Sequence, residues 1–183
     1  DNQMMGGISM YGDSIHINLS NPAAYSKLRL TAYTAGLSHK EYRLKDWEDE
    51  QNTSVTNLDY LSIGFPLAEN LGFGFGLMPY SSVGYSLSDT SLTPGGSEGT
   101  NFFDGSGGVN RLYASIGYEL IRNLSIGVTA NFNFGTLEYE RVQSVEGVQF
   151  GTLDTRESRI NGYDFNYALN YTPTIKDKYT LYT

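Results

Sequence analysis

The feature that most constrains the fold is an alternation of apolar and polar residues that continues without a break from Leu124 to Phe134. The apolar set is Leu124, Ile126, Val128, Ala130, Phe132 and Phe134, and the set between them is Ser125, Gly127, Thr129, Asn131 and Asn133. Side chains of a β-strand point alternately to opposite faces, so this period of two predicts a long strand with one apolar and one polar face.

Two further segments alternate in the same way. Leu71, Phe73, Phe75 and Leu77 are separated by Gly72, Gly74 and Gly76, and five apolar residues from Tyr163 to Tyr171 are separated by Asp164, Asn166, Ala168 and Asn170. These segments predict an all-β antiparallel sheet in which each strand has the same two kinds of face.

An internal repeat connects these segments. Residues 60–65 (YLSIGF), a short turn and residues 70–74 (NLGFG) recur 53 positions later as residues 113–118 (YASIGY) and 123–127 (NLSIG). A weaker third copy begins at Tyr167. Each copy reads as strand, tight turn and strand, so the repeat predicts one β-hairpin used three times.

Strand length distinguishes a membrane barrel from a soluble sandwich. Eleven residues extend over roughly 36 Å at about 3.3 Å per residue, and a tilt of about 45° reduces this to roughly 25 Å, the height of the lipid-facing band of a barrel. The sequence therefore predicts an antiparallel up-and-down transmembrane β-barrel with the apolar face toward lipid. The expected strands are 28–38, 57–66, 70–87, 109–120, 123–144, 157–172 and 178–183.

The expected connections alternate in length. Residues 66–70, 119–123 and 172–178 form short turns, and 39–57, 86–110 and 135–160 form long loops, as in outer-membrane barrels with short periplasmic turns. The glycine clusters 95–99 and 105–108 are expected to be flexible loop residues. Seven strands is an odd number, and a single-chain bacterial barrel has an even number, so we expect an incomplete barrel over 28–183, preceded by a plug-like segment over 1–27.

Composition excludes several functions. The net charge is −8, and phosphate binding needs clustered Lys and Arg, so we expect no nucleic-acid partner. There is no cysteine, and the two histidines are too few for a histidine-based metal site. The acidic run at 46–50 lacks the spacing of a calcium loop, and Asp13, Ser14 and His16 lack a nucleophile elbow. We expect no catalytic residue, no metal and no cofactor.

The segment before the first strand carries a family resemblance. Residues 20–25 (SNPAAY) read as a capped helical turn, with Asn or Ser as cap and Pro22 at the first helical position. Residues 12–25, with Asn21, Pro22 and Ala23 directly before the first strand, resemble the N-terminus of FadL-type outer-membrane transporters, in the version found in Bacteroidota. The resemblance implies a barrel of about fourteen strands, of which this chain is the first part.

The resemblance also implies a function. FadL-type barrels carry long-chain fatty acids and other hydrophobic compounds passively across the bacterial outer membrane. Asn21, Pro22 and Ala23 would then form the hatch of the ligand pathway. The alternation, with its apolar face toward lipid, separately predicts that Gly72, Gly74, Gly76, Asn131 and Asn133 face the lumen. The alternative is a structural or scaffold barrel of an outer-membrane or type IX secretion complex. Expected partners are membrane lipid, lipopolysaccharide, a hydrophobic small molecule and other envelope proteins.

Overall fold

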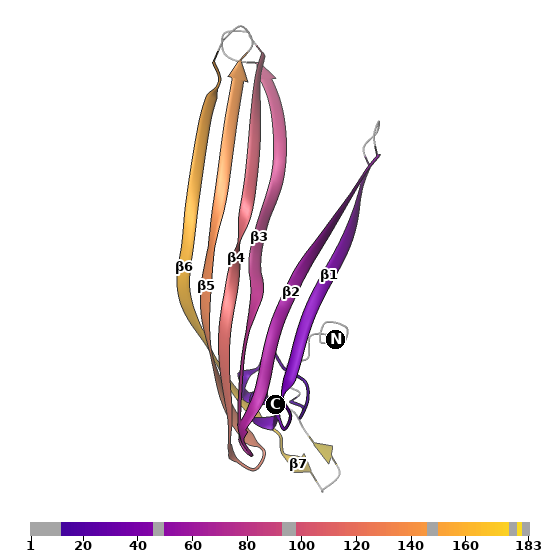
Figure 1. Cartoon of the computed structure of the whole chain (residues 1–183), viewed down its shortest axis with the longest axis vertical. Coiled ribbons are helices and arrows are strands. Elements are labelled where there is room, and N and C mark those ends of the chain that lie inside the picture. Colours follow the sequence, from indigo (N-terminus) through magenta and orange to yellow (C-terminus); the bar gives the residue numbers. More distant parts are fainter. Residues whose placement is uncertain (1–11, 46–49, 93–97, 146–149, 176–178, 181–183) are drawn as a thin grey trace. The chain divides into compact units, whose positions relative to one another are not determined.

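A computed structural model describes residues 12–45, 50–92, 98–145, 150–175 and 179–180 (Figure 1). One short 3-10 helix, η1 (Pro22–Lys27), precedes the strands. The strands are β1 (Ala32–Lys45), β2 (Glu50–Ala68), β3 (Leu71–Leu92), β4 (Glu98–Ile121), β5 (Leu124–Val145), β6 (Thr152–Tyr171), β7 (Thr174–Ile175) and β8 (Tyr179–Thr180). Within the described residues, no helix has the length and apolar character needed to cross a membrane.

The first six strands form one antiparallel sheet in the order of the sequence, β1-β2-β3-β4-β5-β6. This confirms the all-β class, the antiparallel pairing and the hairpin-to-hairpin order. Over the part of the chain that the structure describes, the sheet is open: β1 and β6 are its edges, and it does not close into a barrel. The expected seventh strand at 178–183 is wrong for the described residues, because β8 pairs with β7 in a separate two-stranded sheet.

The internal repeat is visible in backbone hydrogen bonds as well as in strands. The first two copies form the hairpins β2–β3 and β4–β5. The amide of Glu119 donates to the carbonyl of Asn70, and the amide of Thr172 donates to that of Asn123, both at 2.8 Å. Donors and acceptors are each displaced by the repeat length, so the same turn is joined to the next strand in the same way twice. Asn123 has φ 74°, a left-handed conformation that Asn tolerates in tight turns.

The long loops expected from the sequence are wrong. β4 begins at Glu98 rather than 109, β6 begins at Thr152 rather than 157, and β1 continues to Lys45. Residues 105–108, expected in a flexible loop, lie inside β4. Alternation ends where both faces of a strand are polar, but backbone pairing continues past that point. The tips at 46–49, 93–97 and 146–149 lie outside the described residues, and so does most of the acidic run at 46–50.

The chain divides into two compact units. Unit 1 comprises Asp1–Met78, Leu112–Phe132 and Tyr163–Thr183, and unit 2 comprises Pro79–Arg111 and Asn133–Gly162. Unit 1 contains η1, β1, β2 and the alternating parts of the other strands. Unit 2 contains the remaining parts of β3, β4, β5 and β6, which form a four-stranded sheet.

In unit 1 the polar face of the sheet is buried and the apolar face is exposed. Ser125, on the polar side of β5, is 2% exposed, whereas its neighbour Ile126 is 37% exposed. The buried face, here called the covered face, comprises Ser62, Gly64, Gly72, Gly74, Gly76, Tyr113, Ser115, Gly117, Ser125, Gly127, Thr129 and Asn131. The opposite face, here called the apolar face, exposes Tyr33, Leu61, Phe75, Ile116, Tyr118, Ile126, Tyr163, Phe165, Tyr167 and Leu169.

Candidate functional site

The candidate site is the contact between η1 and the covered face, and it begins with the local sequence of η1. Asn21 caps the helix in extended conformation, and its side-chain oxygen accepts a hydrogen bond from the Ala23 amide at 3.0 Å. Pro22 occupies the start of the helix, where a missing N–H leaves no bond unmade. The capped turn expected from the sequence is confirmed. Asn18 orders the turn before the helix, because its side chain accepts from the amides of Ser20 and Asn21.

η1 is the most buried part of the described chain. Ala23 and Ser26 have no exposed surface, and Tyr25 and Leu28 are each 1% exposed. Tyr25, Leu28 and Tyr113 form the hydrophobic core, against which Ile17, Leu19 and Met78 pack. In this unit the core therefore lies between η1 and the polar side of the sheet, rather than between two apolar sheet faces.

Glycines of the covered face make this close approach possible. A Cβ atom on Gly72 would overlap the carbonyl of Tyr25, and one on Gly74 would overlap the Tyr25 ring. A Cβ atom on Gly76 would meet Tyr113. The three glycines singled out in the sequence thus line the region occupied by Tyr25 and Tyr113.

Two further glycines meet the other side of η1. A Cβ atom on Gly117 would lie 2.5 Å from the carbonyl oxygen of Pro22, and one on Gly127 would overlap the peptide between Pro22 and Ala23. The structure therefore brings Pro22 and Ala23 against β4 and β5, and Tyr25 against β3. Neither Gly117 nor Gly127 was singled out in the sequence, although both occupy polar-side positions of alternating or repeated segments, which could have identified them.

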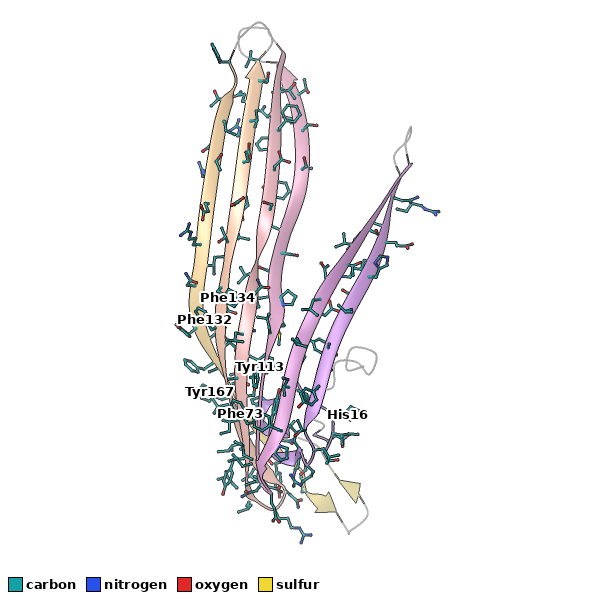
Figure 2. All side chains as sticks on the ribbon, viewed as in Figure 1. His16, Phe73, Tyr113, Phe132, Phe134 and Tyr167 are labelled. Atoms are coloured by element: carbon teal, nitrogen blue, oxygen red, sulfur yellow. The ribbon has the colours of Figure 1, made fainter. Side chains whose placement is uncertain are left out.

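Hydroxyl groups complete the contact. Ser26 Oγ donates to the carbonyl of Ala23 at 2.7 Å and bonds Ser125 Oγ at 2.9 Å. Tyr25 Oη donates to Tyr113 Oη at 3.4 Å, and Tyr113 Oη also hydrogen-bonds Ser62 Oγ. Burial raises the pKa of Tyr25, so its hydroxyl stays protonated and remains a donor. Figure 2 shows Tyr113 near the ends of the strands where η1 lies.

The two asparagines expected in the lumen lie in different surroundings. Asn131 is buried in unit 1, where its Nδ2 donates to Asp164 Oδ1 at 2.5 Å. Asn133 belongs to unit 2, where its Oδ1 accepts from Arg111 Nε at 2.8 Å, and the same guanidinium lies 4.2 Å from the centre of the Tyr80 ring. Their lumen-facing role stays a prediction.

Charged groups hold the C-terminal end of η1. Lys27 Nζ donates to Glu119 Oε1 at 2.9 Å, and both side chains are largely buried. Glu119 also accepts from the Asn123 amide, which ties the ion pair to the β4–β5 turn. Arg29 donates to the carbonyls of Ser26 and Leu28 at 2.9 Å, where the helix ends. Cations at this end are favourable, because the last carbonyls of a helix carry partial negative charge.

Asp13, Ser14 and His16 do not form a nucleophile arrangement. His16 Nδ1 lies 2.6 Å from one oxygen of Asp13, and Ser14 Oγ donates to the other at 3.2 Å. The hydrogen bond from His16 lowers the pKa of Asp13. An activated serine needs the imidazole at its own hydroxyl, whereas here both groups bind the carboxylate. Among the described residues, no three His, Asp or Glu side chains gather as a metal site requires.

Comparison with known proteins gives one family and no individual relative. No curated protein and no solved structure matches this chain. A family model does match, over residues 1–183, and its description is BamG, a name that indicates association with the outer membrane.

The resemblance to FadL-type transporters is therefore wrong, because the family that matches is a different one. The residues that carried the resemblance have a local explanation: Asn21 is a helix cap, Pro22 begins the helix and Ala23 is small enough to lie against Gly127. A capped turn of this kind forms wherever a helix starts, so it is not specific to one family. Since the BamG model spans every residue, the chain belongs to the BamG family.

Proposed function

We propose that this chain is a structural subunit of the outer-membrane Bam complex, with its sheet embedded in the membrane as part of a larger barrel and its N-terminal segment acting as an internal plug. Within the described residues, the plug corresponds to residues 12–27 and the barrel part to β1–β6; residues 1–11 of the expected plug-like segment lie outside the described residues. The role is that of a scaffold: the protein holds a fixed shape in the membrane and offers surfaces to other envelope proteins. We do not propose that this chain transports fatty acids.

The proposal rests on one observation: the polar face of the sheet is buried and its apolar face is exposed. In a soluble protein the apolar face of a sheet packs against a second layer. Here the small and polar face is covered by η1, whereas Tyr163 on the apolar face is 76% exposed. A sheet with its large apolar side chains outward is the arrangement expected of a lipid-facing barrel wall.

The height of the apolar face supports the same environment. On β5 the apolar positions of the alternation run from Leu124 to Phe134, and on β6 they run from Tyr163 to Tyr171. These lengths are about the 9–11 residues that a tilted strand needs to cross a bilayer. We propose that membrane lipid and lipopolysaccharide contact this face.

The open edges support closure by further strands. Among the described residues, β1 and β6 each have one neighbouring strand in the sheet, so the outer side of each faces no further strand of that sheet. Backbone amides and carbonyls without a partner are costly in hydrocarbon, and membrane-spanning sheets are therefore closed. We propose that additional strands complete the barrel between β6 and β1.

The plug is inferred from the kind of contact that η1 makes. η1 contacts β2, β3, β4 and β5 through glycine positions and buried hydroxyls. Contacts of this kind favour a segment that stays in place over a segment that opens and closes. A fixed plug agrees with a scaffold that passes nothing through its interior. The family name supports the Bam complex, rather than the type IX secretion complex, as the assembly concerned.

Two measurements test the proposal. Outer membranes containing the full, affinity-tagged chain are washed with alkaline carbonate, which releases peripheral proteins and leaves embedded ones in the pellet. The pellet is then solubilised in mild detergent and purified on the tag, with an unrelated tagged outer-membrane barrel as control. We expect retention in the pellet and stoichiometric recovery of Bam-complex proteins with this chain alone. Release by carbonate contradicts the embedded barrel, and recovery equal to the control contradicts the scaffold role.

A further inference from the structure

Tyr167 is an exposed tyrosine on the apolar face of unit 1. Its side chain is 77% exposed (Figure 2), and within the described part of the chain its hydroxyl makes no hydrogen bond. Tyr163 and Tyr171 lie four residues away on either side, at the two ends of the apolar stretch of β6. Tyr167 therefore lies at the middle of that stretch, with a polar group that nothing described contacts.

The register of β6 against β5, both within unit 1 at this point, agrees with a position at the middle. The register is fixed by two hydrogen bonds, Asn123–Thr172 and Asn131–Asp164. Both give the same antiparallel alignment, in which Tyr167 lies beside Val128. Val128 is near the middle of the alternation that runs from Leu124 to Phe134, so the two strands place Tyr167 at the same level.

A tyrosine suits the edge of a bilayer better than its centre. Near the headgroups its ring lies in hydrocarbon while its hydroxyl reaches water. Tyr167 lies about 13 Å along the strand from each end of the apolar stretch. A tilt of about 45° makes this about 9 Å in height, which is farther than a tyrosine side chain extends. Lipid tails offer no hydrogen-bond acceptor, so in the proposed orientation this hydroxyl needs a protein partner.

We propose that the apolar face of β6 is a dimer interface within the membrane, at which the Tyr167 hydroxyls of two copies of this chain hydrogen-bond each other. Two copies inserted in the same direction form a closed pair about a two-fold axis along the membrane normal. Such an axis brings equal heights together, so a hydroxyl at mid-height meets its own equivalent. A hydroxyl is both donor and acceptor, so one Tyr167 donates and the other accepts.

The side chains around Tyr167 suit such an interface. Phe165 and Leu169 flank it on the same face and are exposed, and aromatic residues are enriched in the buried centres of protein interfaces. The adjacent positions of β5 are Ile126 and Val128, which carry no polar group and suit lipid. A different protein would need a bonding group at the matching height, whereas a second copy supplies one by symmetry. The inference rests on the proposed function, because it requires the sheet to cross the membrane.

The first test uses outer membranes from cells that express two differently tagged copies of the full chain. Photoreactive p-benzoylphenylalanine replaces Phe165 in both copies, and Tyr167 is kept. The matched control carries the same group in place of Phe75, an exposed phenylalanine of the same face three strands away. After irradiation, we expect a cross-linked product that carries both tags from the variant at position 165 and none from the variant at position 75.

A second pair of variants isolates the hydroxyl group. With the probe at position 165, Tyr167→Phe removes only the oxygen, and Tyr163→Phe makes the same change at the end of the stretch, where headgroups and water bond the hydroxyl. We expect Tyr167→Phe to lower the yield of the double-tagged product about threefold, the factor for a typical side-chain hydrogen bond in a membrane, and Tyr163→Phe to leave it unchanged. Circular dichroism checks folding, and the probe moves to Leu169 if the variant at position 165 does not fold.

Several results would overturn the dimer. A product with a different protein would assign the face to that protein, and cross-linking to lipid alone or within one copy would show that no second copy lies there. Equal yields from the two probe positions, or equal effects of the two tyrosine variants, would also contradict it. Release by carbonate contradicts the proposed function itself, whereas retention in the pellet without a double-tagged product contradicts the dimer alone.

Discussion

At the scale of single residues, the glycines of the covered face are defined by what lies against them. Gly72 and Gly127 leave room for the backbone of η1, which approaches more closely than any side chain would allow. Glycine is needed at position 107 for a different reason, because its φ of 113° is a conformation that other residues rarely adopt. Gly84 has neither constraint, because nothing lies within 4 Å of the position its Cβ would take.

Gly72→Ala tests this difference against Gly84→Ala, a matched change in the same strand. The added methyl group at position 72 must displace the Tyr25 carbonyl, and overpacking of this kind costs about 1–3 kcal/mol. We expect that loss in the free energy of unfolding, measured by urea titration in lipid or detergent, and a change below about 0.5 kcal/mol for Gly84→Ala. Equal stability of the two variants would mean that η1 does not lie on Gly72.

The Ser26–Ser125 hydrogen bond is a second residue-scale test, because both side chains are buried. Replacing one serine by alanine leaves the other hydroxyl with fewer partners, at a cost of about 1–3 kcal/mol. The double variant Ser26→Ala, Ser125→Ala loses both partners together. We expect it to be less destabilised than the sum of the single variants by about 0.5 kcal/mol or more. Strict additivity would show that the two hydroxyls are not coupled.

At the scale of elements, η1 depends on its cap as well as on packing. Asn21→Ala removes the acceptor for the Ala23 amide and should cost about 1 kcal/mol. Asn166→Ala, at an exposed position of β6, is the control and should cost less than about 0.5 kcal/mol. The measurement is proteolysis of the folded protein, with cleavage before β1 expected to be faster in Asn21→Ala alone. Unchanged cleavage would mean that packing alone holds η1.

The sequence predicts these elements unequally, for a physical reason. β5 was expected at 123–144 and spans Leu124–Val145, because its alternation begins directly after a tight turn. β4 was expected at 109–120 and begins at Glu98, because a strand with polar residues on both faces carries no period that marks it. Hydrophobic periodicity reports a difference between two environments, and it disappears where the environments are alike.

The candidate site was predictable in its parts but not as a whole. Asn21, Pro22 and Ala23 were recognisable as a capped turn, and Gly72, Gly74 and Gly76 as a stripe on one side of a strand. Their contact, and the added participation of Gly117, Gly127 and Ser125, depends on tertiary packing between segments up to 99 positions apart. Local sequence patterns contain no information on such distances.

At the scale of the whole molecule, the proposed location in the membrane depends on the apolar face. Ile126→Arg places a charge on that face, and an arginine on a lipid-facing strand costs about 2–4 kcal/mol at the midplane and less toward the interfaces. Leu153→Arg is the matched control, at an exposed apolar position of β6 outside the alternating part. We expect Ile126→Arg alone to lower the yield of folded protein inserted into lipid vesicles. Equal yields of the two variants would indicate a peripheral protein.

The position of η1 in the chain also has a consequence for the order of events during assembly. η1 is synthesised before every strand that it touches, and its bonds reach forward to Tyr113 and to Ser125, 88 and 99 positions later. Contacts that close such large loops form late and slowly, since the entropy of closure must be overcome before any contact is gained. η1 is thus synthesised before these strands but is among the last of these elements to reach its final place, and until β5 is synthesised its apolar residues need protection by something other than this protein.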